Sequence, residues 1–312
     1  MQVKQMFDLT GKVAVVTGGG RGLGRFIAQG LAEAGANVVI ASRKVANCEK
    51  AAEEISRLGV RAVAVKCDTA VEGDIASLVD VTLKEFGTID ILVNNAGITW
   101  GAPTLEYPLD KWDKIFAVNV RGVWILSQKA ANVMKEKGGG KIINISSIFG
   151  SRGSIEEGHP AVAYNPSKAA VEVLTKNLAV KLARYNIKVN CIAPGFFRTD
   201  MMEYIFKPDM KPILDLTLAQ IPLMKYGEED HIKGVAVFLA SAASDFMTGA
   251  VIPLGNPGRD GEIVEHTEAL AAVGERVVRA AREVSGRAFA VRPCKRGEGS
   301  ACLGEVELHN TA

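Results

Sequence analysis

The sequence predicts an α/β fold in which a parallel β-sheet carries helices on both faces. Short apolar runs rich in β-branched residues alternate with longer helical stretches, and the connections between them are short. Such alternation is typical of parallel strands that are buried on both faces. The first apolar run also leads into a glycine-rich segment that opens a helix. With 312 residues, of which 48% are hydrophobic and 23% charged, the composition is that of an ordinary globular protein.

The first strand and helix carry the clearest binding pattern. Residues 13–17 are predicted to form a buried strand, and residues 25–35 a helix that ends at a glycine. Between them, glycines let the backbone approach a pyrophosphate, while free N–H groups at the helix start hold its charge. The segment therefore predicts a Rossmann-type, doubly wound dinucleotide fold, with a purely structural turn as the alternative. The residues of this segment that are predicted to bind the cofactor are Gly18, Arg21, Gly22, Leu23 and Gly24.

The end of the second strand predicts which dinucleotide is bound. This strand, residues 37–41, is followed by Ser42 and Arg43. An acidic residue here would bind the 2′-hydroxyl of NAD. A guanidinium instead pairs with the 2′-phosphate of NADP, which a carboxylate would repel. The sequence thus predicts NADP(H) as the preferred cofactor and NAD(H) as a possible one, against the alternative of a solvated basic turn.

The alternation continues through helices over residues 48–58 and 75–86 and a strand over residues 61–68. A strand starting at residue 89 then runs into residues 94–97. Ligands of such sheets bind beyond the carboxyl ends of the strands. Asp68, Asn95, Ala96 and Gly97 fall at two of those ends.

Two polar residues come next in the chain. Asn119 lies in an apolar helical stretch over residues 112–120, so it must be hydrogen-bonded if it is buried. Ser147 ends a strand over residues 141–147, where it would donate to a substrate carbonyl. The alternatives are that Asn119 braces a helix against a strand and that Ser147 belongs to a turn.

Tyr164 and Lys168 are four residues apart at the start of a predicted helix, so they share one helix face. Pro166 suits the first turn, where its missing N–H is no loss. A phenol ordinarily titrates near pH ~10, and a nearby ammonium favours its ionised form. The pair therefore predicts a general acid/base. The alternative is a surface lysine and a half-buried tyrosine that merely share a face.

These motifs together resemble those of the short-chain dehydrogenase/reductase family. They occur in that family's order and spacing over residues 7 to about 255, and the chain looks most similar to gluconate 5-dehydrogenase-like and 3-oxoacyl-acyl-carrier-protein-reductase-like members. The residues that carry the resemblance are Thr17, Gly18, Gly22, Leu23, Gly24, Asn94, Asn95, Ala96, Gly97, Ser147, Tyr164, Lys168, Pro194 and Gly195.

The resemblance implies a role for each matching residue. Tyr164 would give or take the proton, and Lys168 would favour its ionisation and hold the nicotinamide ribose. Ser147 would orient the substrate oxygen, and Asn119 would support Lys168 through a water-mediated relay. The other implied cofactor contacts are Asp68 near the adenine, Asn95 near the adenosine half, Thr199 by the nicotinamide carboxamide, and Pro194 and Gly195 before it in the chain.

Two segments are expected to set the substrate: the loop over residues 148–163 and a lid over residues 196–222. In them, Arg152, His159 and Arg198 would meet an anionic substrate such as a sugar acid, or would be solvated surface groups. The predicted enzyme is an oxidoreductase that interconverts a secondary alcohol and a ketone, either a sugar acid such as gluconate/5-ketogluconate or a 3-oxoacyl thioester. The alternative is a dinucleotide-binding scaffold or sensor with little turnover that acts through its C-terminal tail.

The predicted domain covers residues 1–255, and residues 256–312 depart from the family pattern. The usual Val-Asp-Gly-Gly ending is replaced by residues 252–255, Ile-Pro-Leu-Gly. Residues 1–255 hold 9 Arg and 20 Lys, whereas residues 256–312 hold 7 Arg and 1 Lys. This shift predicts a fused extension or a reading-frame change. The extension is expected to be part helical, over residues 270–284, or disordered.

Charge and cysteine content exclude several partners. A net charge of +2 gives no reason to expect nucleic acid or a membrane surface. No apolar run reaches the ~18 residues of a membrane span, and the N-terminus lacks the apolar region of a secretory signal. The five scattered cysteines and four distant histidines predict reduced thiols, a cytoplasmic location and no metal site. A homodimer or homotetramer is expected from the resemblance.

Overall fold

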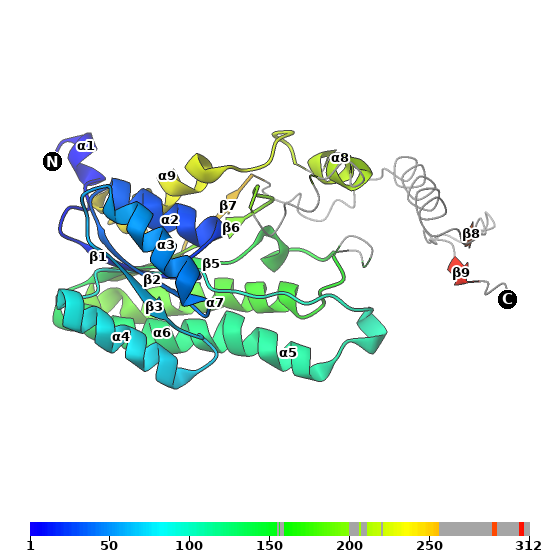
Figure 1. Ribbon diagram of the computed structural model, residues 1–312, viewed down its shortest axis with the longest axis horizontal. Helices are drawn as coiled ribbons and strands as arrows, with labels where there is room; N and C mark the ends of the chain where they lie inside the picture. The colour runs from blue at the N-terminus through cyan, green and yellow to red at the C-terminus, as the bar shows by residue number, and fades with distance from the viewer. Residues whose placement is uncertain are drawn as a thin grey trace. The chain divides into compact units, whose positions relative to one another are not determined.

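The computed structural model describes residues 1–154, 156, 159–199, 206, 211–219, 221–255, 289–291 and 306–308. Within these residues, seven parallel strands form one sheet in the order β3-β2-β1-β4-β5-β6-β7 (Figure 1). The strands are β1 (Val13–Thr17), β2 (Asn37–Ser42), β3 (Ala62–Lys66), β4 (Ile91–Asn94), β5 (Gly140–Ile145), β6 (Ile187–Pro194) and β7 (Val251–Leu254).

Helices cover both faces of this sheet (Figure 1). One face packs against α2 (Gly22–Glu33), α3 (Val45–Ser56) and α9 (Glu229–Ala240). The other packs against α4 (Glu72–Phe86), α6 (Val123–Glu136) and α7 (Tyr164–Leu182). All five residues of β1 are buried, as expected for a central strand between two helical layers. The predicted fold class is confirmed.

The sheet winds outward in two directions from β1. Val15 in β1 pairs with Val39 of β2 on one side and with Leu92 of β4 on the other. The chain therefore builds β1, β2 and β3 in one direction and then crosses back to start β4. Beyond the carboxyl ends of β1 and β4, the diverging connections leave the crevice in which open α/β sheets bind ligands.

Two helices differ from the sequence prediction. Helix α2 begins at Gly22 rather than at Arg25, so two of the predicted loop glycines form its first turn. The predicted helix over residues 112–120 is α5 (Leu109–Phe116) followed by a π-helical turn, η2 (Ala117–Gly122), that continues into α6. A Cβ at Gly122 would lie 2.3 Å from the Thr69 carbonyl oxygen, so the turn packs against another loop at contact distance. Such π-turns often mark functional sites.

Short helical segments complete the first unit: α1 (Val3–Met6), η1 (Thr104–Glu106), η3 (Ile148–Gly150), η4 (Ala183–Tyr185) and η7 (Ala242–Ser244). The chain divides into two compact units, Met1–Glu203 with Gln220–Gly258, and Tyr204–Ala219 with Arg259–Ala312. In the second unit the structure describes α8 (Lys211–Ala219) and an antiparallel pair, β8 (Phe289–Val291) and β9 (Val306–Leu308). The predicted helix over residues 270–284 and much of the predicted lid lie outside the described residues. The domain boundary after residue 255 stays a prediction.

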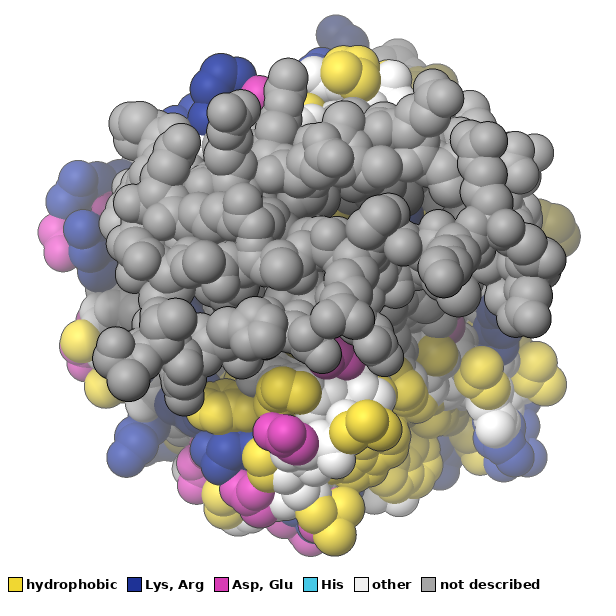
Figure 2. Space-filling view, turned by 90° about the vertical axis from the view of Figure 1, so that its right-hand side faces the viewer, with side chains coloured by type: hydrophobic (Ala, Val, Ile, Leu, Met, Phe, Trp, Pro, Cys, Tyr) yellow, Lys and Arg dark blue, Asp and Glu magenta, His cyan; other side chains and the backbone are white. Residues whose placement is uncertain are grey.

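No helix in the described ranges is long and apolar enough to cross a membrane. On the face seen in Figure 2, the described acidic and basic side chains are interspersed with hydrophobic ones. Charges of both signs are therefore mixed on that part of the surface, in line with a net charge of only +2.

Candidate functional site

Tyr164 and Lys168 lie together at the start of α7. Tyr164 is the first helical residue, and the Nζ of Lys168 is 5.5 Å from the centre of its ring. Lys168 is only 5% exposed. Its Nζ donates a hydrogen bond to the carbonyl of Ile145, the last residue of β5, at 2.9 Å. The predicted pair therefore consists of a buried ammonium held beside a phenol ring.

Ser147 follows β5 and lies near the same helix. Its Oγ accepts a hydrogen bond of 3.3 Å from the backbone N–H of Phe149, and the residue is buried. The neighbouring Ser146 Oγ is 2.8 Å from the Glu172 carboxylate and 3.0 Å from the Lys168 carbonyl, and it can donate to either. Through Ser146, the segment that carries Ser147 is tied to the helix that carries Tyr164.

Asn119 lies in the π-helical turn η2 and is 1% exposed. Its Oδ1 accepts from the N–H of Ile98 and its Nδ2 donates to the carbonyl of Ile98, both at 2.9 Å. Its Nδ2 also donates to Ser167 Oγ at 3.0 Å. A Cβ at Gly97 would lie 3.4 Å from Lys168 Nζ and 3.5 Å from Asn119 Oδ1, so these two side chains meet at Gly97. The water-mediated relay stays a prediction.

The glycine loop connects β1 to α2 at the same edge of the sheet. Gly18 and Gly22 have φ angles of +65° and +54°, which favour glycine. A Cβ at Gly24 would lie 2.4 Å from both Asn95 Nδ2 and the Gly18 carbonyl oxygen, so no larger residue fits there. Asn95 Nδ2 in turn donates to the Thr17 carbonyl at 2.8 Å. This close-packed backbone at a helix N-terminus is a cradle that fits a pyrophosphate.

The end of β2 carries residues that are predicted to bind the adenosine half of a dinucleotide. Arg43 is exposed, and none of the described carboxylates lies within ion-pair distance of it. Ser42 Oγ donates to the Lys44 carbonyl at 3.1 Å. Arg43 therefore remains available for a phosphate. Asp68 differs, since its Oδ1 accepts from the N–H of Ala70 at 3.0 Å within its own turn. Its predicted role near the adenine stays a prediction.

The remaining predicted cofactor residues lie at the start of α2, after β4, and at or after the end of β6. The side chain of Thr199 lies 3.7 Å from the position of a Cβ at Gly22, so the segment after β6 reaches the glycine loop. Ala96 N–H donates to Thr17 Oγ1 at 3.0 Å, and Gly195 N–H donates to the Leu254 carbonyl at 2.8 Å. Pro194 ends β6, while Arg21 is the N-cap of α2 and Leu23 lies in its first turn.

A buried polar network behind the site was not predicted. Asn94 Nδ2 donates to Asn144 Oδ1 at 2.8 Å and to Ser127 Oγ at 2.9 Å. Asn144 Nδ2 donates to Thr175 Oγ1 at 2.9 Å. The network joins β4, β5, α6 and α7. An asparagine in each of two adjacent buried strands was the signal in the sequence.

Aromatic side chains surround Tyr164. The ring of His159 stacks on Phe149 with 4.4 Å between centroids, and it meets Tyr164 edge-on at 5.4 Å. Phe196 contacts Phe149 edge-on at 6.1 Å. Burial lowers the pKa of His159, so the ring is neutral at pH 7. Of the three predicted anion-binding residues, the structure places Arg152 and His159 against the same ring, that of Phe149.

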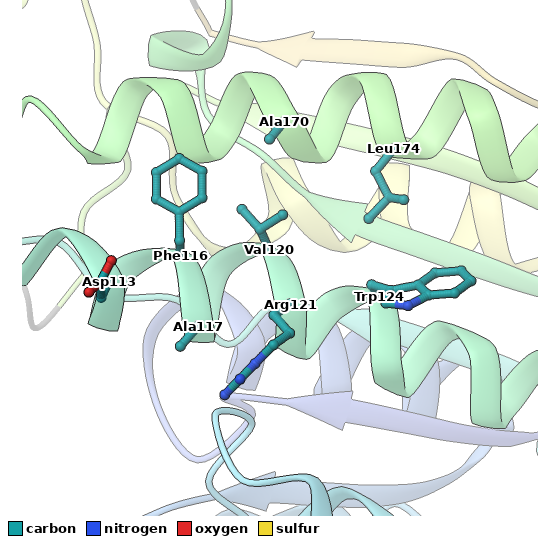
Figure 3. A pocket seen from close by; sticks show the side chains of 8 residues that line it. All are labelled: Asp113, Phe116, Ala117, Val120, Arg121, Trp124, Ala170 and Leu174. Atoms are coloured by element: carbon teal, nitrogen blue, oxygen red, sulfur yellow. The ribbon is translucent and has the colours of Figure 1, made fainter.

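A separate groove of about 580 Å³ lies between η2, α6 and α7. Figure 3 shows Phe116 and Val120 pointing toward Ala170 and Leu174 of α7, whereas Arg121 points away. The lining residues are Asp113, Phe116, Ala117, Val120, Arg121, Trp124, Ala170 and Leu174. None of them belongs to the predicted catalytic set, so this groove is distinct from the site at Tyr164.

Potential metal ligands and cysteines are dispersed in the part of the chain that is described. No group of three or more potential metal ligands occurs there. Cys48, Cys67 and Cys191 are free and buried. Desolvation raises the pKa of Cys67 and of Cys191 to about 12, so neither is a thiolate at neutral pH.

Comparison with known proteins identifies the family. Residues 18–255 match the family described as "Enoyl-(Acyl carrier protein) reductase". The chain is 35% identical over 250 residues to the 5-keto-D-gluconate 5-reductase of Escherichia coli (strain K12), covering 80% of this chain and 96% of that protein. It is 37% identical over 252 residues to the rhamnolipids biosynthesis 3-oxoacyl-[acyl-carrier-protein] reductase of Pseudomonas aeruginosa, with coverages of 80% and 96%.

A solved relative contains a cofactor. The structure of a gluconate 5-dehydrogenase from Burkholderia cenocepacia J2315 in complex with NADP and tartrate superposes with a TM-score of 0.74. It is 35% identical and covers 81% of this chain and 97% of that one. These relatives confirm the predicted resemblance, and the Burkholderia enzyme binds a cofactor of the predicted class, a nicotinamide dinucleotide. The chain belongs to the short-chain dehydrogenase/reductase family.

Proposed function

We propose that this protein is an NADP(H)-dependent oxidoreductase that interconverts a secondary alcohol and a ketone, with Tyr164 as general acid/base. The observation that carries the proposal is the buried Lys168 ammonium, whose Nζ is 5.5 Å from the centre of the Tyr164 ring. Burying a cation without a carboxylate partner costs free energy, and a nearby phenolate would offset that cost.

Tyr164, Ser147 and Lys168 have different roles in the reduction of a ketone. The chemistry that bound NADPH supplies is a hydride for the carbonyl carbon. The Tyr164 hydroxyl protonates the carbonyl oxygen as negative charge develops on it, and the Ser147 hydroxyl donates a hydrogen bond to the same oxygen. Lys168 stabilises the phenolate that remains. In alcohol oxidation the same groups act in reverse, with Tyr164 taking the proton.

Asn119 would position the loop after β4 against α7, and the glycine loop would position the cofactor. Asn119 fixes Ile98 and Ser167, and thereby the loop after β4 against α7. Gly18, Gly22 and Gly24 would cradle the pyrophosphate, and Arg43 would bind the 2′-phosphate. NADP(H) is therefore the preferred cofactor, and NAD(H) a possible one.

Two substrate classes fit the relatives: a sugar acid such as gluconate/5-ketogluconate, and a 3-oxoacyl thioester. The names of the relatives from Escherichia coli and Pseudomonas aeruginosa support one class each. A scaffold or sensor acting through the tail is the competing function, and most of that tail lies outside the described residues.

The test is loss of NADPH absorbance with a panel of keto-sugar acids, β-ketoacyl thioesters and simple diketones. The wild-type protein is expected to turn over at least one class, and Tyr164→Phe to lose about 100-fold or more of kcat. Tyr185→Phe is the control, because that ring lies in η4 away from the site. Binding of NADPH without turnover of any class would favour the scaffold.

We also propose a cytoplasmic homodimer or homotetramer. Trp124, which lines the groove between η2, α6 and α7, and Val173 and Val180 on α7 are exposed apolar residues that support self-association through these helices. Light scattering of the wild-type protein and of Trp124→Glu tests this, with a monomeric wild-type protein as the contradicting result.

A further inference from the structure

Three buried side-chain atoms next to Tyr164 have no hydrogen-bond partner: Arg152 Nε, His159 Nε2 and Asn165 Oδ1. In the part of the chain that the structure describes, they are all the buried side-chain nitrogen and oxygen atoms without a partner. Buried polar groups are nearly always hydrogen-bonded, so these three atoms in one region could receive their partners from a ligand.

The three residues are linked by contacts with the Phe149 ring and with the first turn of α7. The guanidinium carbon of Arg152 is 4.9 Å from the centre of the Phe149 ring, on which His159 also stacks. Asn165 follows Tyr164 in α7, and its Nδ2 donates to the Arg152 carbonyl at 3.1 Å. The segment around Arg152 is thereby held against the first turn of α7.

The charge of Arg152 is not compensated by any carboxylate in the part of the chain that the structure describes. None of the described carboxylates lies within ion-pair distance of its guanidinium. Glu156, the nearest described acid in the loop, accepts instead from the Thr104 N–H at 3.0 Å. Burial lowers the pKa of Arg152, which reflects the unfavourable desolvation of this cation.

We infer that Arg152, His159 and Asn165 form a subsite for a carboxylate and an adjacent hydroxyl of the substrate. This inference rests on the proposed function and narrows its substrate to hydroxy or keto acids. The guanidinium fork matches a carboxylate, the neutral imidazole adds a hydrogen bond, and the Asn165 Oδ1 accepts from a hydroxyl. A neutral ketone or the carbonyl end of an acyl thioester would leave the Arg152 charge unpaired.

The first test is binding, because it needs no turnover. D-gluconate and tartrate are titrated into the protein with NADP⁺, and heat is measured. We expect Arg152→Met to weaken gluconate binding about 10- to 100-fold, because a hydrogen-bonded ion pair is lost. Arg152→Lys keeps the charge without the fork, so it is expected to restore part of the affinity. Arg57→Met is the control, since that arginine is exposed and pairs with Glu53.

The second test separates a subsite from a structural role. For 5-ketogluconate, Arg152→Met is expected to lower kcat/KM by about 10- to 100-fold, mainly through KM. For the neutral ketose D-fructose, kcat/KM is expected to stay within about twofold. His159→Phe keeps the ring stacking on Phe149. It should lower kcat/KM for 5-ketogluconate less than Arg152→Met does, and it should leave kcat/KM for D-fructose unchanged.

The outcomes distinguish this inference from the proposed function. Turnover of neutral ketones without Arg152-dependent binding of gluconate or tartrate would overturn the subsite and leave the oxidoreductase standing. An equal loss for acid and neutral substrates would also overturn it. Arg152-dependent gluconate binding with no turnover of any carbonyl compound would keep the subsite and refute the proposed function.

Discussion

Lys168 Nζ donates a 2.9 Å hydrogen bond to the carbonyl of Ile145, which anchors the side chain from α7 to the end of β5. This bond fixes the ammonium beside Tyr164 in a buried position without a carboxylate partner among the described residues. The positive charge therefore lies beside the Tyr164 ring, where the proposed acid/base role of that phenol needs it, and not in an ion pair with a described carboxylate.

Removing this charge should slow the reaction. Lys168→Met is expected to lower kcat by about 100- to 10,000-fold, because the phenolate loses its stabilising cation. The measurement is steady-state NADPH oxidation, with thermal unfolding to verify the fold. Lys176→Met, an exposed lysine on the same helix, serves as control. Equal kcat values for the two variants would refute the role of Lys168.

Asn119 should contribute mainly to stability. Asn119→Ala removes the hydrogen-bond partner of both backbone groups of the half-buried Ile98, while the buried Ser167 hydroxyl keeps only its bond to the Tyr164 carbonyl. The free energy of unfolding is expected to fall by about 2–4 kcal/mol. Urea unfolding measures this, with the exposed Asn132→Ala as control. A loss no larger than that of the control would mean that the loop does not depend on Asn119.

Arg43 should select the cofactor. Arg43→Asp is expected to lower the ratio of kcat/KM with NADPH to that with NADH by about 100-fold, because a carboxylate repels the 2′-phosphate and accepts from a 2′-hydroxyl. Both cofactors are compared at fixed ionic strength. Lys50→Asp, exposed on α3, controls for the change in net charge. If the ratio of kcat/KM with NADPH to that with NADH stays unchanged, Arg43 does not discriminate between the two cofactors.

His159 should make stability fall at acidic pH. Burial lowers its folded-state pKa below the ordinary value of about 6.5, so the unfolded chain takes up the proton first. Stability is therefore expected to drop as pH decreases through about 6.5 toward the folded-state pKa. His159→Phe removes this contribution, so its unfolding free energy between pH 7 and pH 5 should fall less than that of the wild-type protein. Parallel pH curves would contradict the prediction.

The sheet and the glycine loop could be predicted because their signals are local. The β-branched runs define buried strands, and Gly18, Gly22 and Gly24 mark the turn into α2. The spacing of four residues, also a local signal, predicted that Tyr164 and Lys168 share a helix face. The sequence also predicted that a buried Asn119 needs partners, though not which ones.

The remaining features depend on contacts between distant residues. Asn119 bonds to Ile98 and Ser167, which are 21 and 48 residues away. The π-helical turn that carries Asn119 had no signal in the apolar periodicity. The stacking of His159 on Phe149 joins two residues outside regular helices and strands of the sheet, where side-chain spacing in the sequence does not determine which rings meet.

The measurement that most directly tests the central claim is a single-turnover experiment on preformed complexes with NADPH. Wild-type protein and Tyr164→Phe are mixed with saturating 5-ketogluconate, and the first-order loss of NADPH absorbance is followed. We predict equal NADPH binding by the two proteins and a rate constant about 100-fold or more lower in the variant. Equal rate constants would show that the proton comes from another group.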